Sequence, residues 1–231
     1  MEGFILVLLG TIANAGAIII GGIAGSIFRK GISKRFNNII TSGLGLFTLG
    51  LGITFAIGSQ NAMIVIFSLV IGSIIGEWID IEKRMNDLGN YVQDKLNSKE
   101  GNLSKGFVTA SLLYCVGTMS IMGPLRSGLL NDHNILLTKS VLDGVTSVVF
   151  ASTLGMGVVL SFLPVLLYQG SLTLLASYVA PYLSEAVIIE MTAVGGILLV
   201  GMGINILEIK RLKVGNMLPA IFLPIILMLF M

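Results

Sequence analysis

Long stretches without a charged residue divide this chain, and they constrain its fold more than any other feature. Three of them are Gly3–Phe28, Phe36–Gly76 and Gly144–Ser184. About 20 apolar residues cross a bilayer as a helix. The first stretch is therefore long enough for one helix, and the second and third are each long enough for two. We place the turns within them at Gly58–Asn61 and at Pro164–Gly170.

Three further apolar stretches complete the set. Gly106–Leu125 and Val214–Met231 carry no charge, and Ala186–Leu207 carries only Glu190. The composition agrees, because 11% of the residues are charged, against about 25% in soluble domains. We predict an all-α polytopic integral membrane protein with seven or eight transmembrane helices.

The basic residues indicate an orientation, since cytoplasmic loops collect Lys and Arg. Twelve of the fourteen fall on one side if eight spans place both termini outside. These twelve are Arg29, Lys30, Lys34, Arg35, Lys83, Arg84, Lys95, Lys99, Lys105, Lys210, Arg211 and Lys213. We therefore predict a multi-pass protein of a bacterial inner membrane with both ends outside.

The segment Asp80–Lys105 separates two halves of the chain. Its apolar residues recur at helical spacing among charges, which predicts a cytoplasmic amphipathic helix. Such a helix either docks on the membrane surface or is a solvated linker.

The two halves resemble each other. A shift of 107 positions places "GTIANAG" (Gly10–Gly16) on "GTMSIMG" (Gly117–Gly123). Three spans are an odd number, so a second copy enters the membrane the opposite way round, as in many secondary transporters. A rival alignment pairs Gly203–Arg211 with Gly76–Arg84 and leaves the repeat unit open. The predicted segments are a first repeat (1–79), a linker (80–105), a second repeat (106–184) and two C-terminal spans (185–231).

The stretch "GTMSIMGPLRSGLLND" (Gly117–Asp132), followed by Leu136–Val158, resembles the central signature of the YdfK/YqgA-like bacterial membrane proteins, the family of domain of unknown function 554. The opening "GTIANAGAIIIGGIAG" is similar to that family's N-terminus. The resemblance implies a bacterial inner-membrane protein, often described as a transporter, and supplies no substrate or catalytic residue. Arg126-Ser127 stands where the family pattern has Gln-Asp.

Ionisable side chains inside spans mark pathways or sites by default, because they are costly there. Asp143 is the leading candidate, since Lys139 lies one helical turn before it and Thr146 and Ser147 continue a polar stripe. The alternative is an ordinary ion pair at the headgroup boundary.

Other polar residues are weaker candidates for a solute or ion pathway. Each has a structural alternative: an outer-surface carboxylate, an amide between packed helices, or a polar residue of a turn. These residues are Glu190, Asn14, Ser120 and Arg126.

Gly123 and Pro124 raise the question of a broken helix. Proline removes a backbone donor and clashes with the preceding turn, so the helix either ends near Met122 as an outer turn or breaks inside the membrane. We predict the break.

Three functions are open: a transporter or channel for a small solute or ion, an assembly protein that oligomerises through glycine-rich helix faces, and an intramembrane enzyme. For the protein as a whole we expect a homo-oligomer, with a dimer favoured. The chain has one cysteine, Cys115, and one histidine, His133, and no metal or nucleophile motif. We expect no catalytic residue, metal, cofactor or nucleic-acid partner, and favour the transporter, with intramembrane carboxylates handling a cation or proton.

Overall fold

The computed structural model describes residues 6–29, 33–84, 87 and 103–229, and every regular element in this part of the chain is a helix. Six helical segments are long and apolar enough to cross a membrane. They are α2 (Leu9–Arg29), α3 (Lys34–Ala56), α4 (Ala62–Ile79), α8 (Asn134–Leu154), α9 with α10 (Gly157–Leu160 and Phe162–Leu174) and α12 (Glu185–Ile206). The pair α6 (Leu103–Cys115) and α7 (Thr118–Leu130) is bent by 60° and is either a broken seventh span or a re-entrant loop. The predicted polytopic helical architecture is confirmed.

The last predicted span takes a different form. Val214–Met231 contains a 3₁₀ helix, η2 (Val214–Phe222), and a short α-helix, α13 (Leu223–Leu227). Pro219 lies inside η2 and Pro224 opens α13. Proline cannot donate a backbone hydrogen bond, so a single long α-helix does not form here.

One predicted turn is confirmed and the other is wrong. Residues 57–61 connect α3 to α4, as expected. Pro164–Gly170 instead lies within α10, where Pro164 sits in the first turn, a position that tolerates proline because its N–H has no partner in the helix. The interruption falls earlier, at Gly155, whose φ of 75° ends α8.

The predicted helix break is also displaced. Pro124 lies within α7, and the bend occurs at Gly117, between α6 and α7. Gly117 has φ 111° and ψ 155°, a region that is essentially open only to glycine. The location of the break at Gly123-Pro124 was therefore wrong, because a residue without Cβ redirects the chain more sharply here than proline does.

The helices form two compact units, each built from two stretches of chain. One contains Met1–Asn37 and Asn97–Pro181, and the other contains Asn38–Leu96 and Tyr182–Met231. The segment boundaries predicted from the sequence stay a prediction. The internal repeat stays a prediction, and most of the predicted linker helix Asp80–Lys105 lies outside the described residues.

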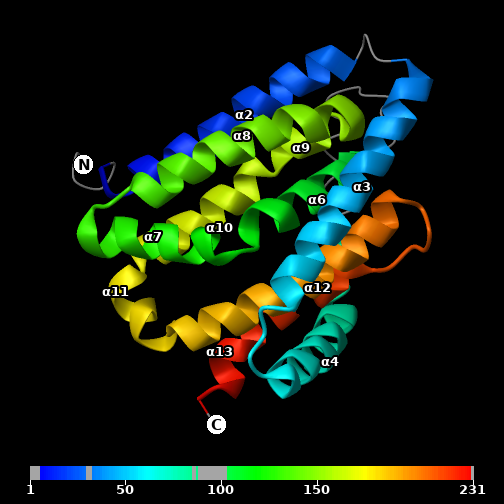
Figure 1. Cartoon of the computed structure of the whole chain (residues 1–231). Coiled ribbons are helices and arrows are strands. Elements are labelled where there is room, and N and C mark those ends of the chain that lie inside the picture. Colours follow the sequence, from blue (N-terminus) through cyan, green and yellow to red (C-terminus); the bar gives the residue numbers. More distant parts are fainter. Residues whose placement is uncertain (1–5, 30–32, 85–86, 88–102, 230–231) are drawn as a thin grey trace. The chain divides into compact units, whose positions relative to one another are not determined.

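In the first unit, α2 and α8 lie side by side (Figure 1). They run parallel, since Gly10 faces Leu136 near their beginnings and Gly25 faces Val148 further along. A Cβ added at Gly21 would collide with the backbone oxygen of Gly144. The small residues of α2 therefore allow the two backbones to approach closely, as is usual between membrane helices.

This close approach predicts a contrast between two glycines of α2. Gly21→Ala should lower the free energy of unfolding by about 2 kcal/mol, because its methyl group has no space against α8. Gly16 has nothing within 4 Å of an added Cβ, so Gly16→Ala should leave stability unchanged or raise it by up to about 1 kcal/mol through helix propensity. Thermal unfolding in detergent, followed by circular dichroism, measures both. Equal losses in the two variants would contradict the proposed helix contact.

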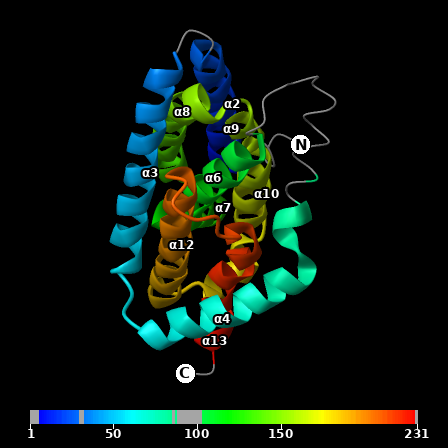
Figure 2. The same cartoon turned by 90° about the vertical axis from the view of Figure 1, so that its right-hand side faces the viewer.

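The second unit uses glycines in the same way. Gly52 of α3 packs against Gly196 of α12, and Gly72 and Gly76 of α4 pack against the backbone of η2 at Ala220 and Asn216. Figure 2 shows α4 lying against η2 and α13.

Candidate functional site

The first unit contains a buried polar network on α8. Lys139, Asp143 and Ser147 follow one another at intervals of four residues and share one helix face. All three side chains are buried, with Lys139 and Asp143 each 6% exposed. The helix begins at Asn134, and the pair is packed inside the protein rather than exposed on its surface.

Lys139 and Asp143 form a close ion pair. The Lys139 ammonium donates to Asp143 Oδ1 at 3.0 Å and lies 2.9 Å from Oδ2. Taking two charges out of water carries a desolvation cost that the attraction between them offsets only with good geometry. The two charges neutralise each other, which explains how a helix that lies largely among apolar residues can contain them.

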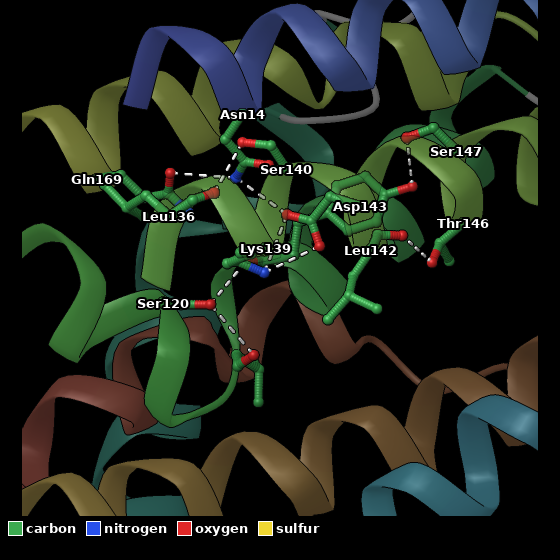
Figure 3. A network of polar contacts seen from close by, with 12 residues as sticks. Asn14, Ser120, Leu136, Lys139, Ser140, Leu142, Asp143, Thr146, Ser147 and Gln169 are labelled. Atoms are coloured by element: carbon green, nitrogen blue, oxygen red, sulfur yellow. Dashed lines mark hydrogen bonds and ion pairs between the residues drawn. The ribbon is translucent and has the colours of Figure 1, made fainter. Parts of the chain in front are cut away.

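Two amides from other helices complete the network (Figure 3). Asn14 of α2 donates through Nδ2 to Asp143 Oδ2 at 3.0 Å and to Gln169 Oε1 of α10 at 3.2 Å. Neither amide side chain is accessible to solvent. The network therefore joins three helices, α2, α8 and α10, around one carboxylate.

Each of these amides also has a buried atom without a hydrogen-bond partner among the described residues. For Asn14 it is the acceptor Oδ1, and for Gln169 it is the donor Nε2. Buried polar atoms are nearly always hydrogen-bonded in folded proteins. Two unsatisfied atoms on neighbouring amides leave this network incompletely hydrogen-bonded.

Hydroxyl groups extend the polar region. Thr11 and Thr173, on the same two helices as the amides, have their hydroxyl oxygens 3.4 Å apart. Tyr114 of α6 and Ser147 share a hydrogen bond of 2.8 Å. Thr11, Tyr114, Ser147 and Thr173 are all buried.

Ser120 lies in the same unit, at the bend between α6 and α7. Its hydroxyl donates to the Tyr114 carbonyl at 2.8 Å and lies 3.4 Å from the Val116 carbonyl. A helix end leaves carbonyls without partners, and these must be satisfied by protein or water in a membrane. Ser120 therefore stabilises the bend, which gives this predicted residue a structural role.

Two other predicted residues of this unit lie apart from the network. Thr146 is only partly buried and donates to the Leu142 carbonyl of its own helix at 2.5 Å. Arg126 has a side chain that is 49% exposed and lies 3.6 Å from Asp132. The polar stripe predicted for α8 therefore includes Ser147 but not Thr146. The two are neighbours in the sequence and so point in different directions from the helix, and only Ser147, four residues after Asp143, points the same way as the ion pair.

Ser127 has its own partners near the N-terminal end of α2. Its hydroxyl donates to the Val7 carbonyl at 2.9 Å and lies 2.7 Å from His133 Nδ1. This is one of the two positions at which the family resemblance implied a different pair of residues. Here it ties the end of α7 to the beginning of α2.

Glu190 belongs to the second unit, where it is almost fully buried. Its carboxylate accepts from the Ser59 hydroxyl at 2.6 Å and from the backbone N–H groups of Gln60 and Asn61 at 2.7 and 2.9 Å. Asn61 in turn caps α4. Three donors from one loop provide an evident structural reason for this buried carboxylate, and its place in a pathway stays a prediction.

A second polar cluster in this unit joins α4 to the beginning of η2. Glu77 Oε1 lies 2.5 Å from Lys213 Nζ, and Glu77 Oε2 accepts from the Asn216 amide at 2.6 Å. Asn216 also accepts from the Glu82 backbone at 2.6 Å. The hydrogen bond with Glu77 raises the pKa of the exposed Lys213 above its usual value.

Sequence reasoning missed Gln169. The predicted turn Pro164–Gly170 placed it in a loop, whereas it lies inside α10 and faces α2. A lone amide in an uncharged stretch was the available signal. This amide became informative only once the stretch that contains it was known to be a helix.

Comparison with known proteins places this architecture in a family. The sequence matches the model described as "Protein of unknown function (DUF554)" over residues 9–229. The chain belongs to this family. It is 38% identical over 221 residues to the "Uncharacterized membrane protein YdfK" of Bacillus subtilis (strain 168), covering 94% of each chain. It is 30% identical over 220 residues to the "Uncharacterized protein YqgA" of Escherichia coli (strain K12), covering 93% of this chain and 94% of the relative.

No solved structure matches the chain. The family membership confirms the resemblance seen in Gly117–Asp132, and with the long apolar helices it makes this a multi-pass membrane protein.

Proposed function

We propose that this protein is a transporter or channel for a small ion or solute, with Asp143 as the residue that handles a cation. The observation that carries the proposal is the buried pair Lys139–Asp143, bonded to an amide from another helix. A charged residue at the centre of a membrane helix costs about 2.5–3.5 kcal/mol on insertion scales. A purely structural contact between these helices could be made by apolar residues at no such cost.

The bend between α6 and α7 supports the same function. Irregular backbone at membrane depth is tolerated where it is buried in protein or lines a water-filled cavity. In many transporters a discontinuous helix lies at the substrate site. Gly117 and Ser120 supply such an interruption in the unit that contains Asp143.

The assembly function has less support. It relied on glycine faces free to meet a second copy, but Gly21, Gly25, Gly72 and Gly76 all contact other helices of this chain. These glycines therefore have a sufficient role inside the monomer.

We also propose that both termini lie outside a bacterial inner membrane. Parallel packing of α2 and α8 supports the N-terminal part of this arrangement, because it requires an even number of crossings from the beginning of α2 to the beginning of α8. The four crossings α2, α3, α4 and the bent pair α6–α7 satisfy that condition and leave the basic clusters on the cytoplasmic side. An outer C-terminus further requires η2 and α13 together to cross as an eighth segment. Labelling of a cysteine added after Met231 with an impermeant reagent tests the assignment.

The transport proposal predicts cation-dependent flux in liposomes. Reconstituted protein should move at least one of Na⁺, K⁺ or H⁺ down an imposed gradient, measured with ion-sensitive dyes. The double variant Lys139→Met/Asp143→Asn, which removes both charges together, should lose at least nine-tenths of the flux.

Thr146→Val is the matched control, since Thr146 lies on the same helix but outside the network. It should retain full flux. Undiminished flux in the double variant would remove Asp143 from the pathway, and no flux in correctly folded native protein would refute transport of these ions.

A further inference from the structure

The two amides of the network can be arranged in a second way. As they stand, Asn14 Nδ2 donates both of its hydrogens, one to Asp143 Oδ2 and one to Gln169 Oε1. Asn14 Oδ1 and Gln169 Nε2 then have no partner among the described residues. An amide is close to symmetric in shape, so turning it over about its last carbon–carbon bond exchanges a donor for an acceptor at almost the same position.

Turning both amides preserves the bond between them and reverses its direction. Gln169 Nε2 would then donate to Asn14 Oδ1. At the same time Asn14 Oδ1 would replace the nitrogen that now lies 3.0 Å from Asp143 Oδ2. Two acceptor oxygens would face each other at that distance, and they repel unless a positive charge lies against both.

We propose that Asn14 Oδ1 and the Asp143 carboxylate form a binding site for an alkali-metal cation, with Gln169 orienting Asn14, and that the site is entered when the two amides turn and Lys139 gives up the carboxylate. This inference deepens the proposed function, because it names the class of ion and the residues that hold it. In the absence of the ion the Lys139 ammonium occupies Asp143, so it acts as a tethered competitor.

The composition of the site favours a monovalent metal ion. Only one carboxylate is present, and the described residues contain no group of three Asp, Glu, His or Cys side chains that could hold a metal. Divalent ions such as Ca²⁺ prefer several oxygen ligands with more negative charge. The amide oxygen of Asn14 is neutral, and so are the Thr11 and Thr173 hydroxyls on the same two helices as the amides. A proton would need only one acceptor, whereas a metal ion uses both the carboxylate and the amide oxygen.

Because Lys139 competes with the ion for Asp143, the affinity for the ion should change in a defined direction when either residue is replaced. Purified protein in N-methylglucamine chloride at constant pH and ionic strength is titrated with LiCl, NaCl or KCl. Its melting temperature is followed by circular dichroism. An ion that binds only the folded protein raises the melting temperature by mass action, and at least one of the three should do so with saturation.

Lys139→Met should lower the half-saturating ion concentration at least tenfold, because the competitor is gone and Asp143 needs another positive partner. Asp143→Asn in the Lys139→Met background should abolish the response. Asn14→Leu and Gln169→Leu should each raise the half-saturating concentration at least tenfold, and Thr146→Val should leave it unchanged.

Binding is read here without any flux, so this inference and the transport proposal can fail separately. Saturable binding without flux in liposomes would refute transport and leave the site in place. Three results would overturn the site. They are the absence of an ion-dependent shift in both the native protein and Lys139→Met, a shift that persists when Asp143 is replaced, and a response to pH alone.

Discussion

Asp143→Asn alone should lower the free energy of unfolding by about 3–5 kcal/mol, because it leaves the buried Lys139 ammonium without its carboxylate. Lys139→Met should cost a similar amount in buffer without alkali-metal ions, since Asp143 then lacks its cation. The double variant Lys139→Met/Asp143→Asn removes both charges and should recover most of the loss. Buried ion pairs replaced by apolar groups are often neutral or even more stable.

Unfolding by denaturant in detergent, analysed as a double-mutant cycle, measures this coupling. The two single losses should exceed the loss in the double variant by several kcal/mol, well above the error of a cycle. Additive losses would mean that Lys139 and Asp143 are solvated separately, which would contradict the buried pair and weaken both proposals.

The sequence was sufficient to predict most of the long apolar helices. In lipid every backbone N–H and C=O must be satisfied within the segment, so a long run without charge is a helix almost regardless of its neighbours. Phe36–Gly76 shows this well, since it divides into α3 and α4 at the predicted turn. The charged residues of α8 show the limit of the rule, because a run of uncharged residues begins at Gly144 while the helix begins at Asn134.

The candidate site could be predicted only in part. Lys139 and Asp143 are four residues apart on one helix, so their contact follows from helical geometry alone. The contacts of Asn14 with Asp143 and Gln169 join residues separated by 129 and 155 positions. The spacing of Gly10, Asn14, Gly21 and Gly25 indicates one closely packed face of α2, but nothing in the sequence encodes that α8 and α10 are the helices that meet it. That choice depends on how glycines such as Gly21 allow the backbones to approach.

The bend between α6 and α7 was predicted for the right stretch and the wrong residue. Proline is a recognisable signal of a break, and Pro124 attracted the prediction. The conformation of Gly117 is the property that matters, and a glycine in a chain with 29 of them carries little signal in the sequence.

The two residues therefore make opposite predictions when each is replaced by alanine. Gly117→Ala should lower the free energy of unfolding by about 3 kcal/mol, because φ 111° with ψ 155° is essentially closed to a residue with a Cβ. It should also reduce flux in liposomes severely, since relief of the strain would move Ser120 away from the carbonyls it satisfies. Unfolding by denaturant and the liposome assay measure the two effects.

Pro124→Ala is the matched control. It restores a backbone N–H within α7, and alanine is about 3 kcal/mol more favourable than proline in a helix interior, so stability should be unchanged or higher even though the buried ring is lost. Should Pro124→Ala be the damaging change and Gly117→Ala the harmless one, the bend would lie where the sequence first suggested. The second helix of the bent pair would then begin after Pro124, and Ser120 would not stabilise the bend.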